Sequence, residues 1–249
     1  MKTKIVTIIF TLYLFFGLSY SAYSGEKNGN NKNSAFFLSD EKANKVYQRN
    51  MLADLLTKII FYKWDKTWIF ESQELYSYDA LNREIESRNQ IYESNQWVNN
   101  TRSLYYYSSG NQTKEVIEQK YKDNSWVNVS RSMMTYNAQN NVIEVIDQEW
   151  DGSAWVNKTK IINNYSSDKL QDIITMAWSS NSWENESKIS YTYNTSGYVD
   201  TLTTSEWSNG TWKDVFRHLK TYDSKGNNIL EEHQIYENGT WTSNIIMEN

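Results

Sequence analysis

The 249-residue chain contains no cysteine and no proline, and it has only two histidines, His218 and His233. Without cysteine it can form no disulfide, no thiolate metal site and no lipid-anchored N-terminal cysteine. Both histidines lie in a single stretch of the chain, 15 residues apart. We interpret them as surface residues. The net charge is −5 with lysine and arginine spread among the acids, so the chain offers no broad basic surface and nucleic acid is not expected as a partner.

Long apolar runs are also lacking, except at the start of the chain. There, MKTK is followed by the apolar run IVTIIFTLYLFFGL and then by the small residues of SYSAYS. This order is typical of a secretory signal peptide, and we place it at residues 1–24 with cleavage near Ser24. The alternative is a membrane anchor, but the run is shorter than the roughly 20 residues that cross a bilayer. The sequence therefore predicts a secreted or cell-surface protein, with no membrane span after cleavage.

Two segments precede the main body of the chain. Residues 25–38 are polar and rich in asparagine and glycine, which predicts a disordered spacer. Residues 39–57 predict a helix that caps the body, with Ser39 at its N-terminus and apolar residues such as Tyr47 and Met51 at three- and four-residue spacing. Alternatively, Leu55 to Trp64 already form a strand. Trp64 lies four residues before Trp68 and so stands where the other units have their second aromatic residue.

Residues 58–249 form a repeat with a period of 28 or 29 residues. The units begin at Trp68, Trp97, Trp126, Trp155, Trp183 and Trp212, and a seventh stops eight residues after Trp241. Ten residues after each leading tryptophan stands a tyrosine, namely Tyr78, Tyr107, Tyr136, Tyr165, Tyr193 or Tyr222. A fixed period of this length indicates an array of supersecondary units. The early stop in the seventh unit favours a fragment of a longer protein.

Each unit predicts a pair of β-strands. Segments rich in aromatic and β-branched residues end at polar clusters such as SSGN and DGSA. We therefore expect an all-β antiparallel hairpin array in a single extended or coiled meander sheet, with neighbouring strands paired throughout. The residues that flank the inter-unit loops, such as Trp150 with Trp155 and Trp178 with Trp183, should contact one another across the hairpin.

An odd period would turn equivalent side chains to alternate faces of the sheet, so each unit needs one extra residue. We place it in the turn after the tyrosine, whose fourth residue is of a type that tolerates positive φ. These residues are Asn82, Asn111, Asn140, Gly197 and Gly226. The unit of Trp155 is one residue shorter and should have a different turn. With this correction, one face should collect the tryptophans, the tyrosines, the glutamines and an acid, and the other face the basic residues.

The segments Tyr222-Asp-Ser-Lys-Gly-Asn and Tyr78-Asp-Ala-Leu-Asn-Arg resemble the tyrosine-aspartate (YD) repeats of Rhs-type and teneurin-type secreted shells. The whole unit looks still more like the Trp/Tyr repeats of uncharacterised exported proteins of the Bacteroidota. The resemblance covers about Trp64 to Asn249, and it implies an array of hairpins that coils. Long members of the YD family enclose a toxic domain, but six units are too few for that role, so the function is not carried over.

The sequence has no phosphate-loop glycine pattern, no nucleophile elbow and no histidine-rich metal spacing. We therefore expect neither an enzyme nor a metal or cofactor site, and we interpret Asp151-Gly152 and Asp223 to Gly226 as turns rather than calcium loops.

Exposed aromatic rings beside amides and acids remain as candidate ligand-binding residues. They are Tyr76, Tyr105, Tyr191, Trp150, Trp155, Trp178, Trp183, Trp207 and Trp212. The alternative is that these rings only pack on one another. The sequence thus predicts a non-catalytic binding or adhesion module for polysaccharide or another surface protein, with affinity that rises with the number of units. The competing interpretation is a structural spacer or a fragment of a larger surface protein.

Overall fold

The computed structural model describes the backbone of residues 35–40, 43–50 and 55–248 and the side chains of residues 55–243 and 245–247. The chain divides into two units, Met1–Lys32 and Asn33–Asn249. The predicted signal peptide and most of the predicted spacer lie outside the described residues. Within the described ranges, no helix is long and apolar enough to cross a bilayer.

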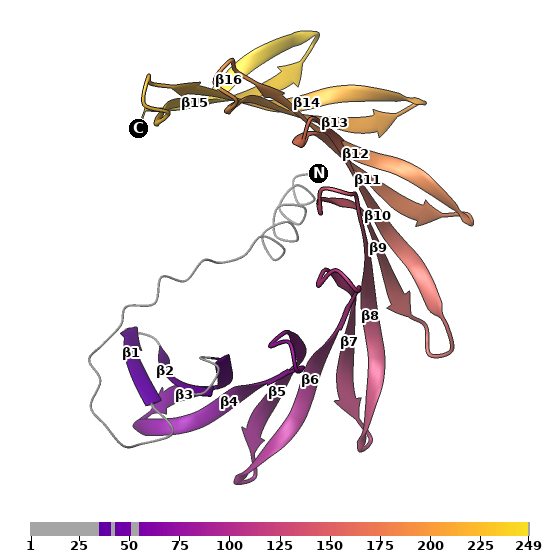
Figure 1. Cartoon of the computed structure of the whole chain (residues 1–249). Coiled ribbons are helices and arrows are strands. Elements are labelled where there is room, and N and C mark those ends of the chain that lie inside the picture. Colours follow the sequence, from indigo (N-terminus) through magenta and orange to yellow (C-terminus); the bar gives the residue numbers. More distant parts are fainter. Residues whose placement is uncertain (1–34, 41–42, 51–54, 249) are drawn as a thin grey trace. The chain divides into compact units, whose positions relative to one another are not determined.

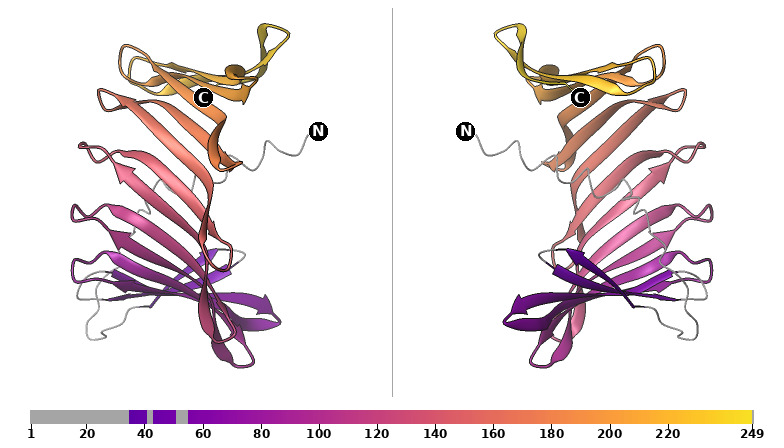
Figure 2. Two further views of the ribbon diagram at one scale, coloured as in Figure 1. Left: turned by 90° about the vertical axis from the view of Figure 1, so that its right-hand side faces the viewer. Right: turned by 90° about the vertical axis from the view of Figure 1, so that its left-hand side faces the viewer.

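Sixteen strands form one antiparallel sheet in which each strand pairs with its neighbours in sequence (Figures 1 and 2). The strands are β1 (Ala35–Asp40), β2 (Ala43–Asn50), β3 (Leu55–Asp65), β4 (Thr67–Tyr78), β5 (Glu84–Glu93), β6 (Gln96–Tyr107), β7 (Thr113–Lys122), β8 (Ser125–Tyr136), β9 (Val142–Trp150), β10 (Trp155–Ser166), β11 (Lys169–Ser179), β12 (Ser182–Tyr193), β13 (Val199–Ser208), β14 (Thr211–Tyr222), β15 (Asn228–Glu237) and β16 (Thr240–Glu248). The predicted all-β meander of hairpin repeats is confirmed.

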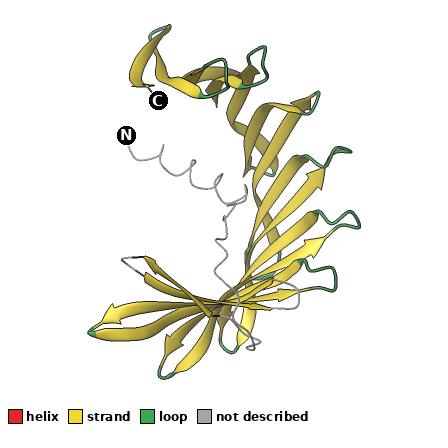
Figure 3. Cartoon of the chain, turned by 60° about the vertical axis from the view of Figure 1, so that its left-hand side comes forward, coloured by secondary structure: helices red, strands yellow, loops and turns green. Residues whose placement is uncertain are grey.

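The predicted helix at residues 39–57 is wrong, since the described residues of that range lie in β1, β2 and β3 and all described elements are strands (Figure 3). β2 pairs with β3 in a register that places Tyr47 opposite Ile59. Pairing explains the difference, because β3 would otherwise expose the unpaired N–H and C=O groups of a sheet edge. The alternative that Leu55 to Trp64 form a strand is confirmed, and Ala35 to Leu38, expected in the spacer, belong to β1.

Two-residue turns connect most of the units. Between β5 and β6, Ser94 and Asn95 have φ values of 50° and 63°, and Glu93 pairs directly with Gln96. Positive φ at both central residues matches the right-handed twist of the two strands. The same conformation recurs at Asp123-Asn124, Ser180-Asn181, Asn209-Gly210 and Asn238-Gly239.

A longer turn follows the repeat tyrosine. In the first such turn, Oδ1 of Asp79 accepts hydrogen bonds from the backbone N–H groups of Leu81 and Arg83 at 2.8 and 3.0 Å. Asn137, Asn194 and Asp223 use their Oδ1 atoms in the same way. The aspartate of the Tyr-Asp segments is therefore a loop acceptor that asparagine can replace.

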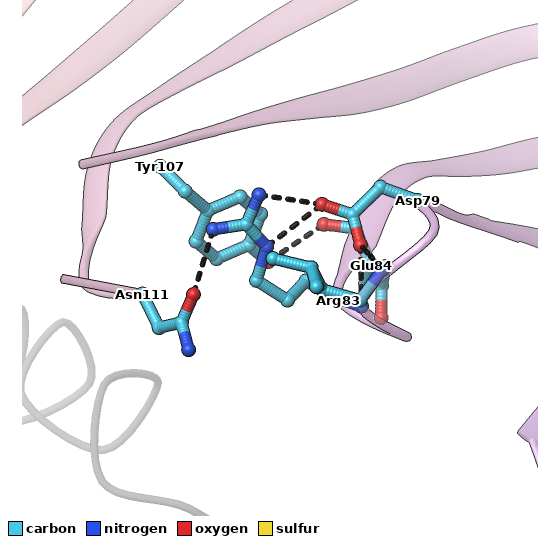
Figure 4. Close-up of polar contacts among 6 residues, drawn as sticks. Asp79, Arg83, Glu84, Tyr107 and Asn111 are labelled. Atoms are coloured by element: carbon cyan, nitrogen blue, oxygen red, sulfur yellow. Dashed lines mark hydrogen bonds and ion pairs between the residues drawn. The ribbon is translucent and has the colours of Figure 1, made fainter. Parts of the chain in front are cut away.

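The predicted conformation of the fourth turn residue is confirmed. Asn82, Asn111, Asn140, Gly197 and Gly226 all have positive φ. The short unit differs as expected, because Ser167 and Asp168 form a two-residue turn there. Turns of neighbouring units also touch, since Nη1 of Arg83 donates to Oδ1 of Asn111 at 3.0 Å, while Arg83 also contacts Asp79 (Figure 4).

Each unit contains two register shifts. One lies beside the repeat tyrosine, where Ser77 pairs with Glu86 but Tyr78 pairs with Glu84. The other lies in the inter-unit hairpin and was not expected: Gln90 pairs with Asn99, whereas Asn89 pairs with Thr101. Because each bulge leaves one residue unpaired, the second shift reverses the facing of all residues beyond it.

The expected division of the two faces is therefore wrong in part. The tryptophan face carries the tryptophan pairs and the glutamines, as predicted, but also the basic residues, since Arg102 pairs directly with Gln119. The tyrosine face carries the repeat tyrosines and apolar positions such as Met134 and Ile173, which are only 9% and 8% exposed. Tyr76, Tyr105 and Tyr191 also lie on the tyrosine face. Each is separated by an odd number of residues from a residue of the tryptophan face on the same strand, and side chains alternate between the faces along a strand.

The repeat tyrosines link one unit to the next. The hydroxyl group of Tyr107 donates to the backbone carbonyl of Glu84 at 2.6 Å, and that of Tyr136 donates to the carbonyl of Thr113 at 2.8 Å. Tyr78, Tyr193 and Tyr222 make equivalent bonds. The residue whose carbonyl group accepts each of these bonds lies next to a bulge. The tyrosine therefore satisfies a backbone carbonyl group near the point where the ladder of hydrogen bonds between the strands is interrupted.

Candidate functional site

A row of aromatic pairs runs along the tryptophan face at the inter-unit hairpins. The ring centroids of Trp150 and Trp155 are 5.1 Å apart, and those of Trp178 and Trp183 are 4.9 Å apart, both in edge-to-face geometry. Trp207 and Trp212 form a third such pair at 4.9 Å. The predicted cross-strand contacts are confirmed.

A cation from the preceding unit covers each of several tryptophans. The guanidinium carbon of Arg102 lies 4.5 Å from the centroid of Trp126, and Arg102 Nε donates to Oε1 of Gln119 at 2.7 Å. Gln119 in turn donates to Asn128 at 2.7 Å. Arg131, Lys160, Lys188 and Arg217 lie in the same way over Trp155, Trp183, Trp212 and Trp241. In these units the rings are half-buried parts of a packed polar and aromatic lattice.

The first hairpins depart from this pattern at three positions. Gln73 stands where the other units have the cation, Phe70 stands where Asn99 and Asn128 stand, and Tyr62 stands in place of the glutamine. The Tyr62 and Phe70 rings are in contact at 5.1 Å, so an aromatic pair replaces the amide pair. Gln73 is 4% exposed and donates to Oε1 of Gln90, which leaves it unavailable to cover a ring.

These replacements bring six aromatic rings together on one face of two neighbouring hairpins, and we name this set the aromatic platform. It consists of Tyr62, Trp64, Trp68, Phe70, Tyr92 and Trp97. Trp64 and Trp68 are paired at 5.3 Å, and Phe70 reaches the next hairpin, with its ring 5.0 Å from Tyr92 and 5.4 Å from Trp97. Trp64 is 63% exposed, Trp68 45% and Phe70 38%. Among the described side chains, no cation lies over Trp68 or Trp97.

The tyrosine face carries a polar depression of 380 Å³ at the same hairpins. Its lining includes Glu74, Tyr76, Glu84 and Tyr105. The hydroxyl group of Tyr76 donates to Glu74, and burial raises the pKa values of Glu84, Tyr76 and Tyr105. These groups satisfy one another, and no cluster of three or more His, Asp or Glu side chains in the described part of the chain could hold a metal ion.

The two histidines form a stack across β14 and β15. The ring centroids of His218 and His233 are 3.8 Å apart at an interplanar angle of 13°, and Phe216 packs edge-on against both. Burial, followed by the proximity of His233, lowers the pKa of His218. The histidines are thus half-buried partners, which differs from our interpretation of them as surface residues.

The structure separates the nine candidate ligand-binding residues into two groups. Tyr76, Tyr105 and Tyr191 lie on the tyrosine face, where burial raises the pKa of each hydroxyl group. The six tryptophans lie on the tryptophan face as the three pairs described above, and of these Trp207 is the most exposed, at 37%. The most exposed tryptophan pair among the described residues is Trp64–Trp68, which the sequence indicated as a pair but not as candidate ligand-binding residues. The signal that could have revealed it is the loss of the repeat residues at Tyr62, Phe70 and Gln73.

No family model matches the chain, and no curated protein matches it. Among solved structures, the chain is similar to a Bacteroides fragilis protein of unknown function, with 13% identity and a TM-score of 0.41 over 48% of this chain and 91% of that one. It is also similar to a porin-like protein from Bacteroides uniformis, with 11% identity and a TM-score of 0.40 over 85% of this chain and 92% of that one. The TcdB2-TccC3-TEV structure matches with 13% identity and a TM-score of 0.37 over 78% of this chain, which spans 12% of that chain's length.

Proposed function

We propose that this protein is an exported, non-catalytic binding module that attaches to carbohydrate through the aromatic platform. The observation that carries the proposal is the departure from the repeat: among the described side chains, a cation lies over each leading tryptophan from Trp126 onward, but none lies over Trp68 or over Trp97, where Phe70 and Gln73 replace the asparagine and the cation of the other units. If the rings served only for packing, the asparagine and the cation of the other units would serve equally well at these two positions.

The chemistry of the platform suits sugars. An exposed aromatic face binds the apolar C–H face of a pyranose, because both surfaces leave water and the ring quadrupole attracts the polarised hydrogens. Trp64 and Trp68 expose more than two fifths of their surface, and a cluster of such rings on a soluble protein marks an interaction site.

Restoring the repeat residues tests the proposal. The variant Phe70→Asn with Gln73→Arg carries the residue types of the other units, so we expect it to fold and to place the new guanidinium over Trp97. Wild-type protein should be retarded in native gels that contain soluble polysaccharide, whereas the double variant should not. Trp207→Phe serves as the control, since Trp207 is 37% exposed but lies outside the platform, and it should be retarded like the wild type.

Equal retardation of the double variant would show that the platform is not the binding site. If the wild-type protein is not retarded by any neutral or acidic polysaccharide, the carbohydrate proposal fails. A structural spacer would then be the better interpretation, because the cation-covered tryptophans and the tyrosine bonds join one unit to the next along the array.

A further inference from the structure

The rings of the platform follow one another across the strands. Trp68 and Trp97 occupy the same position in successive units, and β3 to β6 are consecutive neighbours in the sheet. Phe70 follows Trp68 by two residues on β4 and contacts Tyr62 and both rings of the second pair. In later units a cation occupies the space between successive pairs, as Arg102 does before Trp126. Among the described side chains, the platform rings therefore extend over two hairpins with no cation over Trp68 or Trp97, which is longer than one sugar ring can fill.

The platform ends at Trp97 on its C-terminal side. The next pair is Tyr121 and Trp126, and Arg102 lies over the Trp126 ring while it donates to Gln119. An approaching sugar would have to displace a guanidinium that is also 3.7 Å from Glu86. Displacement would break charge-assisted contacts, so the covered pairs do not repeat the site in the later units.

The charges around the platform nearly cancel. The exposed charged residues of the β3–β4 and β5–β6 hairpins are two basic and three acidic residues, namely Lys63, Lys66, Asp65, Glu71 and Glu93. In the neighbouring units the cations of the tryptophan face are paired with acids, as Arg131 is with Glu115 at 3.2 Å. A surface with nearly balanced charges gives only a weak field for an acidic or basic polymer.

We infer that the ligand is an uncharged, linear polysaccharide that lies lengthwise across β3 to β6, with successive sugar residues stacked on Trp64–Trp68, on Phe70 and on Tyr92–Trp97. The inference rests on the proposed carbohydrate-binding function. It adds the charge, the shape and the minimum length of the ligand. It also differs from the expectation of affinity that rises with the number of units, since the described part of the chain forms one such site.

Three measurements on the full chain test the inference. In native affinity gels, a neutral β-glucan or mannan should retard the protein, and alginate should not. In competition experiments, a hexasaccharide of the effective polysaccharide should displace the protein about tenfold better than the disaccharide, because only the longer ligand spans both hairpins. Phe70→Ala, which removes the ring that contacts Tyr92 and Trp97 but leaves the Trp64–Trp68 and Tyr92–Trp97 pairs in place, should abolish most of this advantage of the hexasaccharide.

The result that overturns the inference is retardation by alginate that weakens with added salt, or equal competition by the disaccharide and the hexasaccharide. Either outcome leaves carbohydrate binding at the platform intact, so it is distinguishable from failure of the proposed function, in which no polysaccharide retards the wild type. Circular dichroism of Phe70→Ala and Phe70→Asn checks folding. If Phe70→Ala is unfolded, Phe70→Asn takes its place, and an unchanged hexasaccharide advantage in that variant also contradicts the inference.

Discussion

The guanidinium carbon of Arg102 lies 4.5 Å from the ring centroid of Trp126, a residue of the next repeat unit. The same side chain donates to Gln119 and approaches Glu86, so one arginine contacts three different strands. Equivalent cations recur through the array. Because each unit contacts only its neighbours, contacts of this kind supply the coupling between units on which the stability of a repeat protein depends.

Replacing such a cation should destabilise the array. We expect Arg131→Met to lower the free energy of unfolding by about 1–2 kcal/mol, because it removes a cation–π contact and leaves Gln148 without its donor. Urea unfolding followed by circular dichroism measures the change. Lys158→Met is the control, since the exposed pair Lys158–Glu149 should contribute little. Similar effects of the two substitutions would show that the covered ring adds no stability.

The hydrogen bonds of the repeat tyrosines should stabilise the fold to an extent that differs between the units. Tyr136→Phe removes the hydroxyl group that donates to the Thr113 carbonyl and should cost about 1 kcal/mol. In the short unit, Asn163 donates to the carbonyl of Val142 instead, at 2.9 Å. Tyr165→Phe should therefore change the melting temperature less than Tyr136→Phe. The reverse order would disprove this assignment of the hydrogen bonds.

Two turn glycines should differ although their backbone conformations match. Gly226 and Gly239 have φ values of 85° and 82°, so alanine at either position costs about 1 kcal/mol. A Cβ atom at Gly226 would also lie 2.4 Å from the hydroxyl oxygen of Tyr198, whereas a Cβ atom at Gly239 would have only its own chain neighbours within 4 Å. We expect Gly226→Ala to lower the melting temperature more than Gly239→Ala. Equal losses would mean that the Tyr198 ring moves aside without cost.

The histidine stack predicts sensitivity to acid. Burial and His233 lower the pKa of His218 in the folded chain, so the unfolded chain binds the proton more tightly. The stabilising contribution is therefore present above the unfolded pKa of about 6.5 and is lost as the pH falls below it. Lys220 and Glu231 are the charged neighbours, 3.2 Å apart, while Leu202 and Ile245 are the residues paired with the stack on β13 and β16.

Melting temperatures at about pH 7.5 and about pH 5.5 measure this effect. The variant His233→Gln removes one ring of the stack and should reduce the difference between the two pH values. If the wild type and the variant lose the same stability on acidification, other groups are responsible for the acid sensitivity.

Local residue types determined the repeat and its turns. The tryptophan and tyrosine period predicted the strands, and the asparagines and glycines predicted positive φ, because both depend on interactions within a few residues. The helix prediction for residues 39–57 failed, because a three- and four-residue spacing of apolar residues does not reveal that β3 presents an edge to which this segment can pair.

The facing of the side chains and the aromatic platform were decided only by the tertiary structure. The bulge in the inter-unit hairpins leaves Asn100, Val129, Lys158, Glu186 and Val215 unpaired, residues with no common chemistry. The sequence therefore carries no local sign of a shift that moves the cations to the tryptophan face. Whether a ring is covered or exposed follows from that register, since Arg102 and Trp126 meet across strands and not along the chain.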